Sequence, residues 1–190
     1  MLYKFLRPIA VFLFKIFFRI EVKGKYNIPK EGGVIIASNH LSNLDPVVLG
    51  VASPRRLNFL AKEELFRNQL FSRFIKSLGA IPLKREKRDI SAVKKAYKIL
   101  KREEVLVIFP QGSRIFKGKI YPGVGFLAKK ANVPVVPTKI LGTDKILPPG
   151  KGFFHLEKIK VVFGRPFNVK DGLSPKDITE RIFSEIKNLK

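Results

Sequence analysis

The amino-acid sequence predicts an α/β fold, a single mixed, largely parallel sheet flanked by helices and preceded by an interfacial amphipathic helix. Short runs rich in β-branched residues alternate with helical stretches along most of the chain, as expected for strands joined by crossover helices. Several of these runs are apolar throughout, which is typical of strands buried on both faces. The length of 190 residues fits one domain, and a hydrophobic content of 45% is enough to bury a sizeable core.

The segment 1–20 predicts a helix that lies in a membrane interface. It is apolar and rich in aromatic residues, and four basic residues fall within one helical arc of about 120°, namely Lys4, Arg7, Lys15 and Arg19. Its longest uncharged run, residues 8–14, is far below the ~20 residues that span a bilayer. A signal peptide is disfavoured because no small-residue cleavage site follows. The alternative is a helix packed on the protein's own core.

Strands and helices then alternate without an internal repeat or a low-complexity linker. Strands are predicted at residues 18–22, 33–37, 57–61, 80–83, 105–109, 135–140 and 158–163. Helices are predicted at residues 46–52, 63–67, 70–77, 90–102, 123–131 and 175–188. In the helix at 90–102, apolar residues recur at helical spacing, so its many lysines form a solvated face.

The charge of the chain predicts anionic partners. There are 38 Lys and Arg against 15 Asp and Glu, which gives a formal net charge of +23. Such a field favours nucleic acid, an anionic membrane, phosphorylated substrates or an acidic carrier protein, and charge alone does not choose among them. Cysteine is absent, which excludes thiol nucleophiles, disulfides and cysteine-ligated metals. Histidine occurs only at His40 and His155, so a site with three histidine ligands is impossible.

A first candidate site follows the strand predicted at 33–37. His40 lies in the turn after this strand, and the pair Asp45-Pro46 predicts the start of the next helix, with Asp45 as its N-cap. A turn can fold His40 back against Asp45, so that the carboxylate fixes the imidazole tautomer and leaves the other nitrogen free to accept a proton. Alternatively, Asp45 only caps its helix and His40 is a turn residue, although one carboxylate can serve both purposes.

A second candidate site follows the strand predicted at 105–109, because ligands gather at the loops beyond strand ends in α/β sheets. Gly112 allows close backbone approach, Ser113 offers a hydroxyl, and Arg114 offers a planar fork matched to phosphate oxygens. Lys62 and Arg85 are further basic candidates. Alternatively, the loop is an ordinary turn and the cations are surface charges.

Four ordered blocks of the chain resemble the glycerolipid acyltransferase family. The segment NHLSNLD at 39–45 matches the His-x4-Asp motif of that family, and GAIPLKR at 79–85 resembles its second block. The third block, usually Phe-Pro-Glu-Gly-Thr-Arg, resembles FPQGSR at 109–114, and the fourth resembles VPVVPTKI at 133–140. The resemblance runs from about residue 22 to residue 167. In two positions the chain departs from the family, with Gln111 in place of Glu and Ser113 in place of Thr.

The resemblance implies transfer of a fatty acyl group from a thioester of acyl carrier protein or coenzyme A to the sn-2 hydroxyl of lysophosphatidate, giving phosphatidate. It implies no metal and no redox cofactor. In that scheme His40 removes the hydroxyl proton and Asp45 orients it. The resemblance further implies that the acceptor phosphate is bound by Lys62, Arg85, Gln111, Gly112, Ser113 and Arg114, and that Pro134 shapes the acyl-binding side.

We therefore expect a membrane-interface helix at 1–20 and an acyltransferase domain at 21–190, bound peripherally or monotopically to the cytoplasmic face of the cell membrane. The expected partners are anionic phospholipid, lysophosphatidate and the carrier protein or coenzyme A thioester. Nucleic acid is not expected, because the aromatic residues gather in the N-terminal apolar segment rather than among basic residues. The alternatives are an acyltransferase for glycerol 3-phosphate or another lysolipid, and a non-catalytic basic protein that binds membrane or nucleic acid.

Overall fold

A seven-stranded sheet forms the centre of the computed structural model, which describes residues 2–84, 89–112, 121–150, 155–169 and 172–190. The strand order is β1-β7-β6-β2-β5-β3-β4, and of the described strand pairs only β6 and β7 run antiparallel. The strands are β1 (Glu21–Lys23), β2 (Val34–Ser38), β3 (Leu57–Lys62), β4 (Ala80–Leu83), β5 (Val105–Ile108), β6 (Val135–Leu141) and β7 (Lys160–Phe163). The predicted mixed, largely parallel sheet is confirmed.

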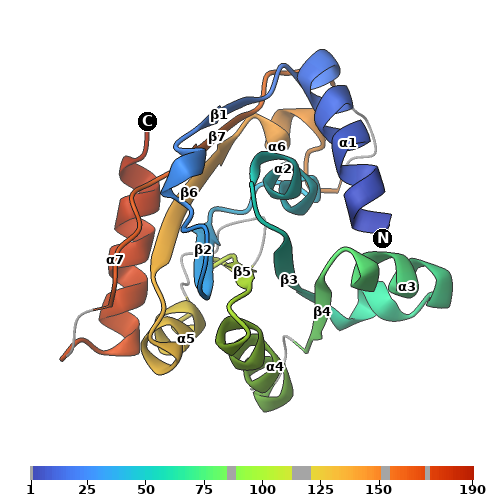
Figure 1. Cartoon of the computed structure of the whole chain (residues 1–190). Coiled ribbons are helices and arrows are strands. Elements are labelled where there is room, and N and C mark those ends of the chain that lie inside the picture. The colour runs from blue at the N-terminus through green and yellow to red at the C-terminus, as the bar shows by residue number, and fades with distance from the viewer. Residues whose placement is uncertain (1, 85–88, 113–120, 151–154, 170–171) are drawn as a thin grey trace.

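Helices cover both faces of this sheet (Figure 1). On one face lie α1 (Leu2–Phe18) and α2 (Asp45–Ala52), and on the other lie α4 (Ile90–Lys101), α5 (Gly123–Ala131) and α7 (Pro175–Asn188). Beyond the edge strand β4 lies α3 (Gln69–Ser77), which packs against β4 and the 3-10 helix η2 (Glu63–Phe66). The sequence prediction missed η1 (Lys25–Asn27) and α6 (Thr143–Ile146), each about one turn long.

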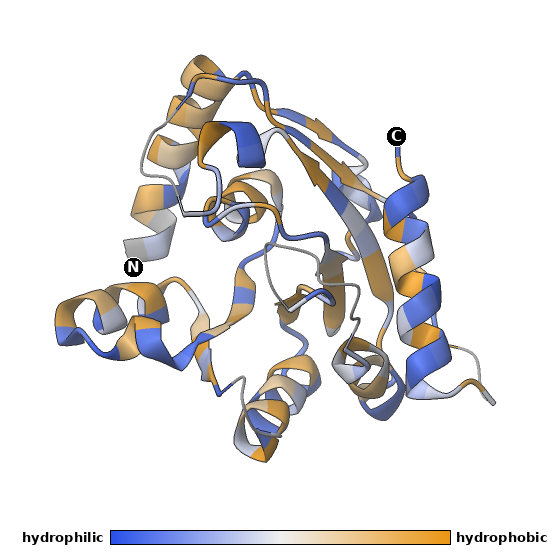
Figure 2. Ribbon diagram, turned by 180° about the vertical axis from the view of Figure 1, so that it is seen from behind, coloured by the Kyte–Doolittle hydropathy of each residue, from blue (hydrophilic) through white to orange (hydrophobic). Residues whose placement is uncertain are grey.

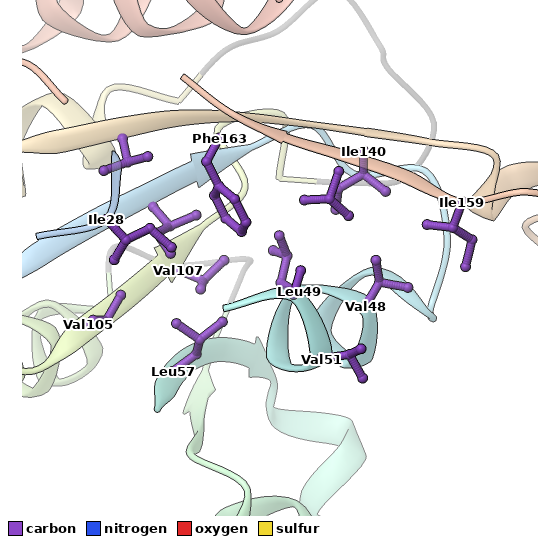
Figure 3. Close-up of a cluster of buried hydrophobic side chains, with 14 of the residues drawn as sticks. Ile28, Val48, Leu49, Val51, Leu57, Val105, Val107, Ile140, Ile159 and Phe163 are labelled. Atoms are coloured by element: carbon purple, nitrogen blue, oxygen red, sulfur yellow. The ribbon is translucent and has the colours of Figure 1, made fainter. Parts of the chain in front are cut away.

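The core consists of two apolar layers separated by the sheet. Along β2, Val34 and Ile36 face the layer under α1 and α2, which Figure 3 shows in close-up. The alternate residues Ile35 and Ala37 face the layer under α4, α5 and α7. Because both faces of β2 are covered, each of these four side chains is fully buried. The loop that carries His40 therefore begins directly after a fully buried strand.

The boundary between α1 and β1 differs from the prediction. Residues 18–22 were expected to form a strand, but α1 continues to Phe18, and Arg19 turns the chain with a positive φ of 42°. Phe18 already accepts a hydrogen bond from the N–H of Ile159 through its carbonyl oxygen, at 3.0 Å. The parallel ladder with β7 then begins at Glu21. Helix and strand therefore follow each other after a two-residue turn.

The N-terminal helix α1 is apolar on two sides. One side packs on the core through Ala10, Val11, Phe14 and Phe18, while Phe5 and Phe12 on the other side remain 68% and 62% exposed. Figure 2 shows that hydrophobic residues predominate in this helix. Arg7, one of the four residues of the predicted basic arc, contacts the protein itself. Its guanidinium donates to the carbonyl oxygens of Gly50 (3.4 Å) and Ser53 (2.7 Å) at the end of α2, where unpaired carbonyls attract cations. Among the described residues, no helix combines the length and apolarity needed to cross a bilayer.

Candidate active site

The candidate residues gather at one edge of the sheet. The strands β2, β3, β5 and β6 are parallel neighbours, so their carboxyl ends meet at this edge. His40 follows β2, Lys62 ends β3, Gln111 follows β5, and Thr143 follows β6. The register places Ser38 level with Thr138, which brings the His40 loop beside the turn at Thr143.

His40 and Asp45 form a buried hydrogen-bonded pair. Nδ1 of His40 lies 2.7 Å from Oδ2 of Asp45, and the side chains are 11% and 0% exposed. The carboxylate therefore fixes the tautomer with the proton on Nδ1. Nε2 has no hydrogen-bond partner among the described residues, so this nitrogen is available to accept a proton.

Asp45 holds this loop by accepting four hydrogen bonds. Besides His40, its Oδ2 accepts from the backbone N–H groups of Leu41 (2.6 Å) and Ser42 (2.8 Å). Its Oδ1 accepts from the hydroxyl of Thr143 at 2.6 Å, and Thr143 is fully buried. The helix α2 does begin at Asp45, but Leu44 is the N-cap, so the predicted capping role of Asp45 is wrong. The carboxylate instead folds back over the turn, because three donors converge there.

Further contacts fix the position of His40. Its ring stacks on Phe109, with ring centroids 4.2 Å apart and planes 19° apart. Its backbone N–H donates to Oε1 of Gln111 at 2.9 Å. The preceding Asn39 pairs through its side-chain amide with the backbone of Ile140, donating to the carbonyl (2.8 Å) and accepting from the N–H (2.7 Å). The loop is thereby bound to β5 and β6 on either side.

Gly112 is required by the shape of the loop itself. Its φ is +66°, a left-handed conformation that favours glycine, and a Cβ at this position would lie 2.8 Å from the ring of Tyr121. Its N–H donates to the carbonyl of Phe109 at 2.9 Å, which closes a tight turn after β5. The sequence prediction assigned this glycine to close approach of a ligand, and the structure adds a conformational reason.

The remaining predicted residues are placed differently. Lys62 is exposed and lies two strands away from β2, at about 10 Å laterally. Arg85, Ser113 and Arg114 lie outside the described residues. Pro134 precedes β6, and its carbonyl accepts from the N–H of Ile35 at the beginning of β2. It therefore lies at the opposite edge of the sheet from His40.

Asn39 and Thr143 are the residues that the sequence prediction missed. Asn39 stands inside the quoted His-x4-Asp segment, and its neighbour position to His40 was the available signal. Thr143 is 98 residues from Asp45, and its hydrogen bond depends on the pairing of β2 with β6. Within the described residues, no group of three His, Asp or Glu side chains is arranged to bind a metal ion.

Comparisons with known proteins agree with one another. A family model described as Acyltransferase matches residues 19–141. The 1-acyl-sn-glycerol-3-phosphate acyltransferase of Bacillus subtilis is 32% identical over 154 residues, which cover 80% of this chain and 75% of the relative. The Streptococcus pneumoniae protein of the same name is 30% identical, covering 100% of this chain and 73% of the relative. The crystal structure of the 1-acyl-sn-glycerophosphate (LPA) acyltransferase PlsC from Thermotoga maritima is similar, with a TM-score of 0.80 and 26% identity over 97% of this chain and 78% of that one.

Proposed function

Because this chain belongs to the acyltransferase family and is an enzyme of the 1-acyl-sn-glycerol-3-phosphate acyltransferase type, we propose that it acylates the sn-2 hydroxyl of lysophosphatidate. The acyl donor in this proposal is a thioester of acyl carrier protein or coenzyme A, and the product is phosphatidate. The observation that carries the proposal is the buried pair of His40 and Asp45, in which Nε2 of His40 is left to accept a proton.

In the proposed mechanism His40 is the general base. Nε2 takes the proton of the sn-2 hydroxyl while the hydroxyl oxygen forms a bond to the thioester carbonyl carbon. The carbon–sulfur bond then breaks, and the leaving thiolate receives the proton from the imidazolium. Asp45 accepts from Nδ1 throughout, which orients the ring and stabilises its cationic form. The products are phosphatidate and a free thiol, and the scheme requires no metal and no redox cofactor.

In this proposal, basic side chains beyond the carboxyl ends of the parallel strands bind the phosphate of the acceptor. Lys62 ends β3 at the edge where His40 lies, which supports its role, while Arg85 and Arg114 enter the proposal from the family resemblance alone. Gln111 and Gly112 contribute differently, because the first holds the backbone of His40 and the second forms the turn. The proposal also includes the organisation of the chain, with a membrane-interface helix at residues 1–20 and the acyltransferase domain at residues 21–190. The enzyme would act at an anionic phospholipid membrane.

One assay with two variants tests this function. The purified protein is offered acyl carrier protein and coenzyme A thioesters together with lysophosphatidate, glycerol 3-phosphate or other lysophospholipids. We expect transfer to lysophosphatidate, and we expect His40→Ala to lower kcat by about 10²- to 10⁴-fold, which is the usual contribution of a positioned base. His155→Ala is the matched control and should be nearly silent, since His155 is exposed.

The outcomes separate the mechanism from the substrate. Near-normal turnover by a folded His40→Ala variant would remove His40 as the base. Preference for glycerol 3-phosphate or another lysolipid would keep the mechanism and change the acceptor. Absence of transfer with every acceptor, combined with binding to nucleic acid that weakens steeply with salt, would favour a non-catalytic basic protein.

A further inference from the structure

The helix α3 presents its apolar side to the solvent. Leu70, Phe71 and Phe74 are 82%, 46% and 43% exposed, whereas the small polar Ser72 is 6% exposed. At about 100° per residue, Leu70, Phe74 and Phe71 occupy one arc of about 100°, and Ser72 lies outside it. A helix that stabilises a soluble core usually has the reverse arrangement, with its apolar residues inward. Packing within the described chain therefore does not account for the exposed side chains Leu70, Phe71 and Phe74.

Exposed cations outnumber exposed acids around this face, where Glu63 and Glu64 of η2 are the acids and Glu63 pairs with Lys84 at 3.7 Å. Leu65 of η2 adds a further apolar side chain that is 47% exposed. The exposed cations Arg67, Arg73 and Lys76 lie on η2's end and on α3. Figure 2 shows α3 as a helix with both strongly hydrophobic and strongly hydrophilic residues at the margin of the molecule. Apolar residues beside exposed cations are typical of helices that lie in the interface of an anionic bilayer.

Arg56 connects α3 to α1. Its Nη2 donates to the carbonyl of Ser77 at the end of α3 (2.9 Å), and its guanidinium carbon lies 5.6 Å from the ring centroid of Tyr3 in α1. A cavity of about 210 Å³ is lined here by Tyr3, Arg7, Arg55 and Arg56, together with Pro8 and Pro54. Arg56 therefore contacts both helices with exposed apolar faces, and the cavity beside it is lined by three arginines of α1 and the segment after α2.

We propose that α3 is a second membrane-binding element, in which Leu65, Leu70, Phe71 and Phe74 insert into an anionic phospholipid bilayer beside α1. The inference rests on the proposed function in one respect, since a lysolipid acceptor is itself held in a membrane. The combination of exposed apolar side chains with nearby cations favours an anionic bilayer, because charge alone would suit an acidic protein equally well. The position agrees, since η2 and α3 directly follow Lys62 at the edge where His40 lies.

The test uses the full chain and vesicles of mixed phosphatidylglycerol and phosphatidylcholine. The double variant Leu70→Ser/Phe74→Ser should bind these vesicles at least about tenfold more weakly in co-sedimentation, because two apolar side chains no longer leave water. Its thermal unfolding should match that of the parent, since both side chains are exposed. Phe126→Ser is the matched control, because Phe126 is 41% exposed but lies on α5, which covers the face of the sheet opposite to α1. It should bind as the parent does.

A kinetic arm separates this inference from the proposed function. With acceptor embedded in vesicles the double variant should be slower than the parent, and with acceptor dispersed in detergent the two should be equal. Vesicle binding by the double variant equal to that of the parent would overturn the inference, whatever the activity. If the parent transfers no acyl group to any acceptor but the double variant still loses vesicle binding, the inference holds and the proposed function fails.

Discussion

At the residue scale, the carboxylate of Asp45 is the centre of the candidate site. It accepts from His40, Leu41, Ser42 and Thr143, and it is fully excluded from solvent. A buried carboxylate is costly unless donors satisfy it, and four donors do so here. Because the donors come from its own loop and from α6, the direction of the carboxylate toward His40 is fixed before any substrate binds.

We predict that Thr143 positions Asp45 for catalysis. Thr143→Val keeps the shape of the side chain but removes the donor to Oδ1, and a hydrogen bond to a charged group contributes about 1.5–3 kcal/mol. We expect kcat to fall about tenfold or more with little change in KM. Steady-state kinetics measures both, and Thr143→Ser should restore most of kcat because it returns the hydroxyl. A lower melting temperature with unchanged kcat would instead make Thr143 a purely structural residue.

Gln111 occupies the position of a Glu in the family motif that this segment resembles, and its contact is one that either residue can make. Its Oε1 accepts from the N–H of His40, a role that either side chain can perform. Gln111→Glu should therefore change kcat/KM by less than about tenfold, ~1.4 kcal/mol. Gln111→Met, which fills similar space without an acceptor, should lose more. A large gain in kcat/KM from Gln111→Glu would mean that Gln111 marks a weakened site.

The short-range part of the site was predictable from the sequence, and the long-range part was not. His40 and Asp45 are five residues apart, so the spacing and the turn between them suffice to predict contact. Thr143 reaches Asp45 only because β6 pairs with β2, which no local pattern encodes. The predicted capping role of Asp45 was wrong for a related reason. Its carboxylate accepts from three donors that converge on it in the folded loop, and not from the N–H groups at the start of α2.

At the element scale, α3, α4 and α7 each begin at a polar N-cap residue whose side chain accepts a backbone hydrogen bond. Asp89 is the N-cap of α4, and its carboxylate accepts from the N–H groups of Lys84 (2.9 Å) and Ala92 (3.0 Å) and from the hydroxyl of Ser91 (2.7 Å). These bonds, first among them the one from Lys84, lower the pKa of Asp89 to about 2. The ionised carboxylate of Asp89 therefore stabilises the start of α4, the helix that follows β4 in the chain.

This cap predicts a specific pH dependence. At neutral pH, Asp89→Ala should lower the free energy of unfolding by about 1 kcal/mol. Because the folded pKa of about 2 lies below the ordinary value of 3.8, the stabilisation is present above pH 3.8 and is lost as the pH falls toward 2. The difference between parent and variant in urea unfolding should shrink in that window. Asp89→Asn keeps an acceptor for Ala92 and cannot titrate, so an unchanged dependence in Asp89→Asn would contradict this origin.

The types of the elements were predicted well because apolar periodicity is a local property of the sequence. The boundary between α1 and β1 was predicted wrongly. The run of apolar residues continues from α1 into the segment before β1, so periodicity gave no stop signal between helix and strand. The turn depends on a positive φ at Arg19, and this conformation cannot be predicted from an arginine because non-glycine residues rarely adopt it. The single turns η1 and α6 were missed because three or four residues contain too little periodicity to detect.

At the scale of the whole molecule, parallel strands and covering helices follow from the alternation in the sequence, but the strand order does not. The last strand, β7, lies antiparallel beside β6 and parallel beside β1, so it joins β1 to the rest of the sheet. The helices α1 and α2 lie against this part of the sheet. Such pairings depend on contacts between residues far apart in the chain. In this arrangement one side of α1 packs on the core and the other side is exposed, so the core-packing alternative accounts for only one side of the helix.

The two sides of α1 predict opposite outcomes for neighbouring phenylalanines. Phe12 is 62% exposed, so Phe12→Ser should leave the free energy of unfolding within about 0.5 kcal/mol and weaken binding to anionic vesicles. Phe14 is 9% exposed and lies 5.1 Å from Phe18 between ring centroids, so Phe14→Ala should cost about 3–5 kcal/mol of stability while the folded fraction still binds vesicles. Urea unfolding and vesicle co-sedimentation measure the two effects. Equal vesicle binding by the parent and Phe12→Ser would make α1 a helix of the core alone, because only the outward side distinguishes the two functions.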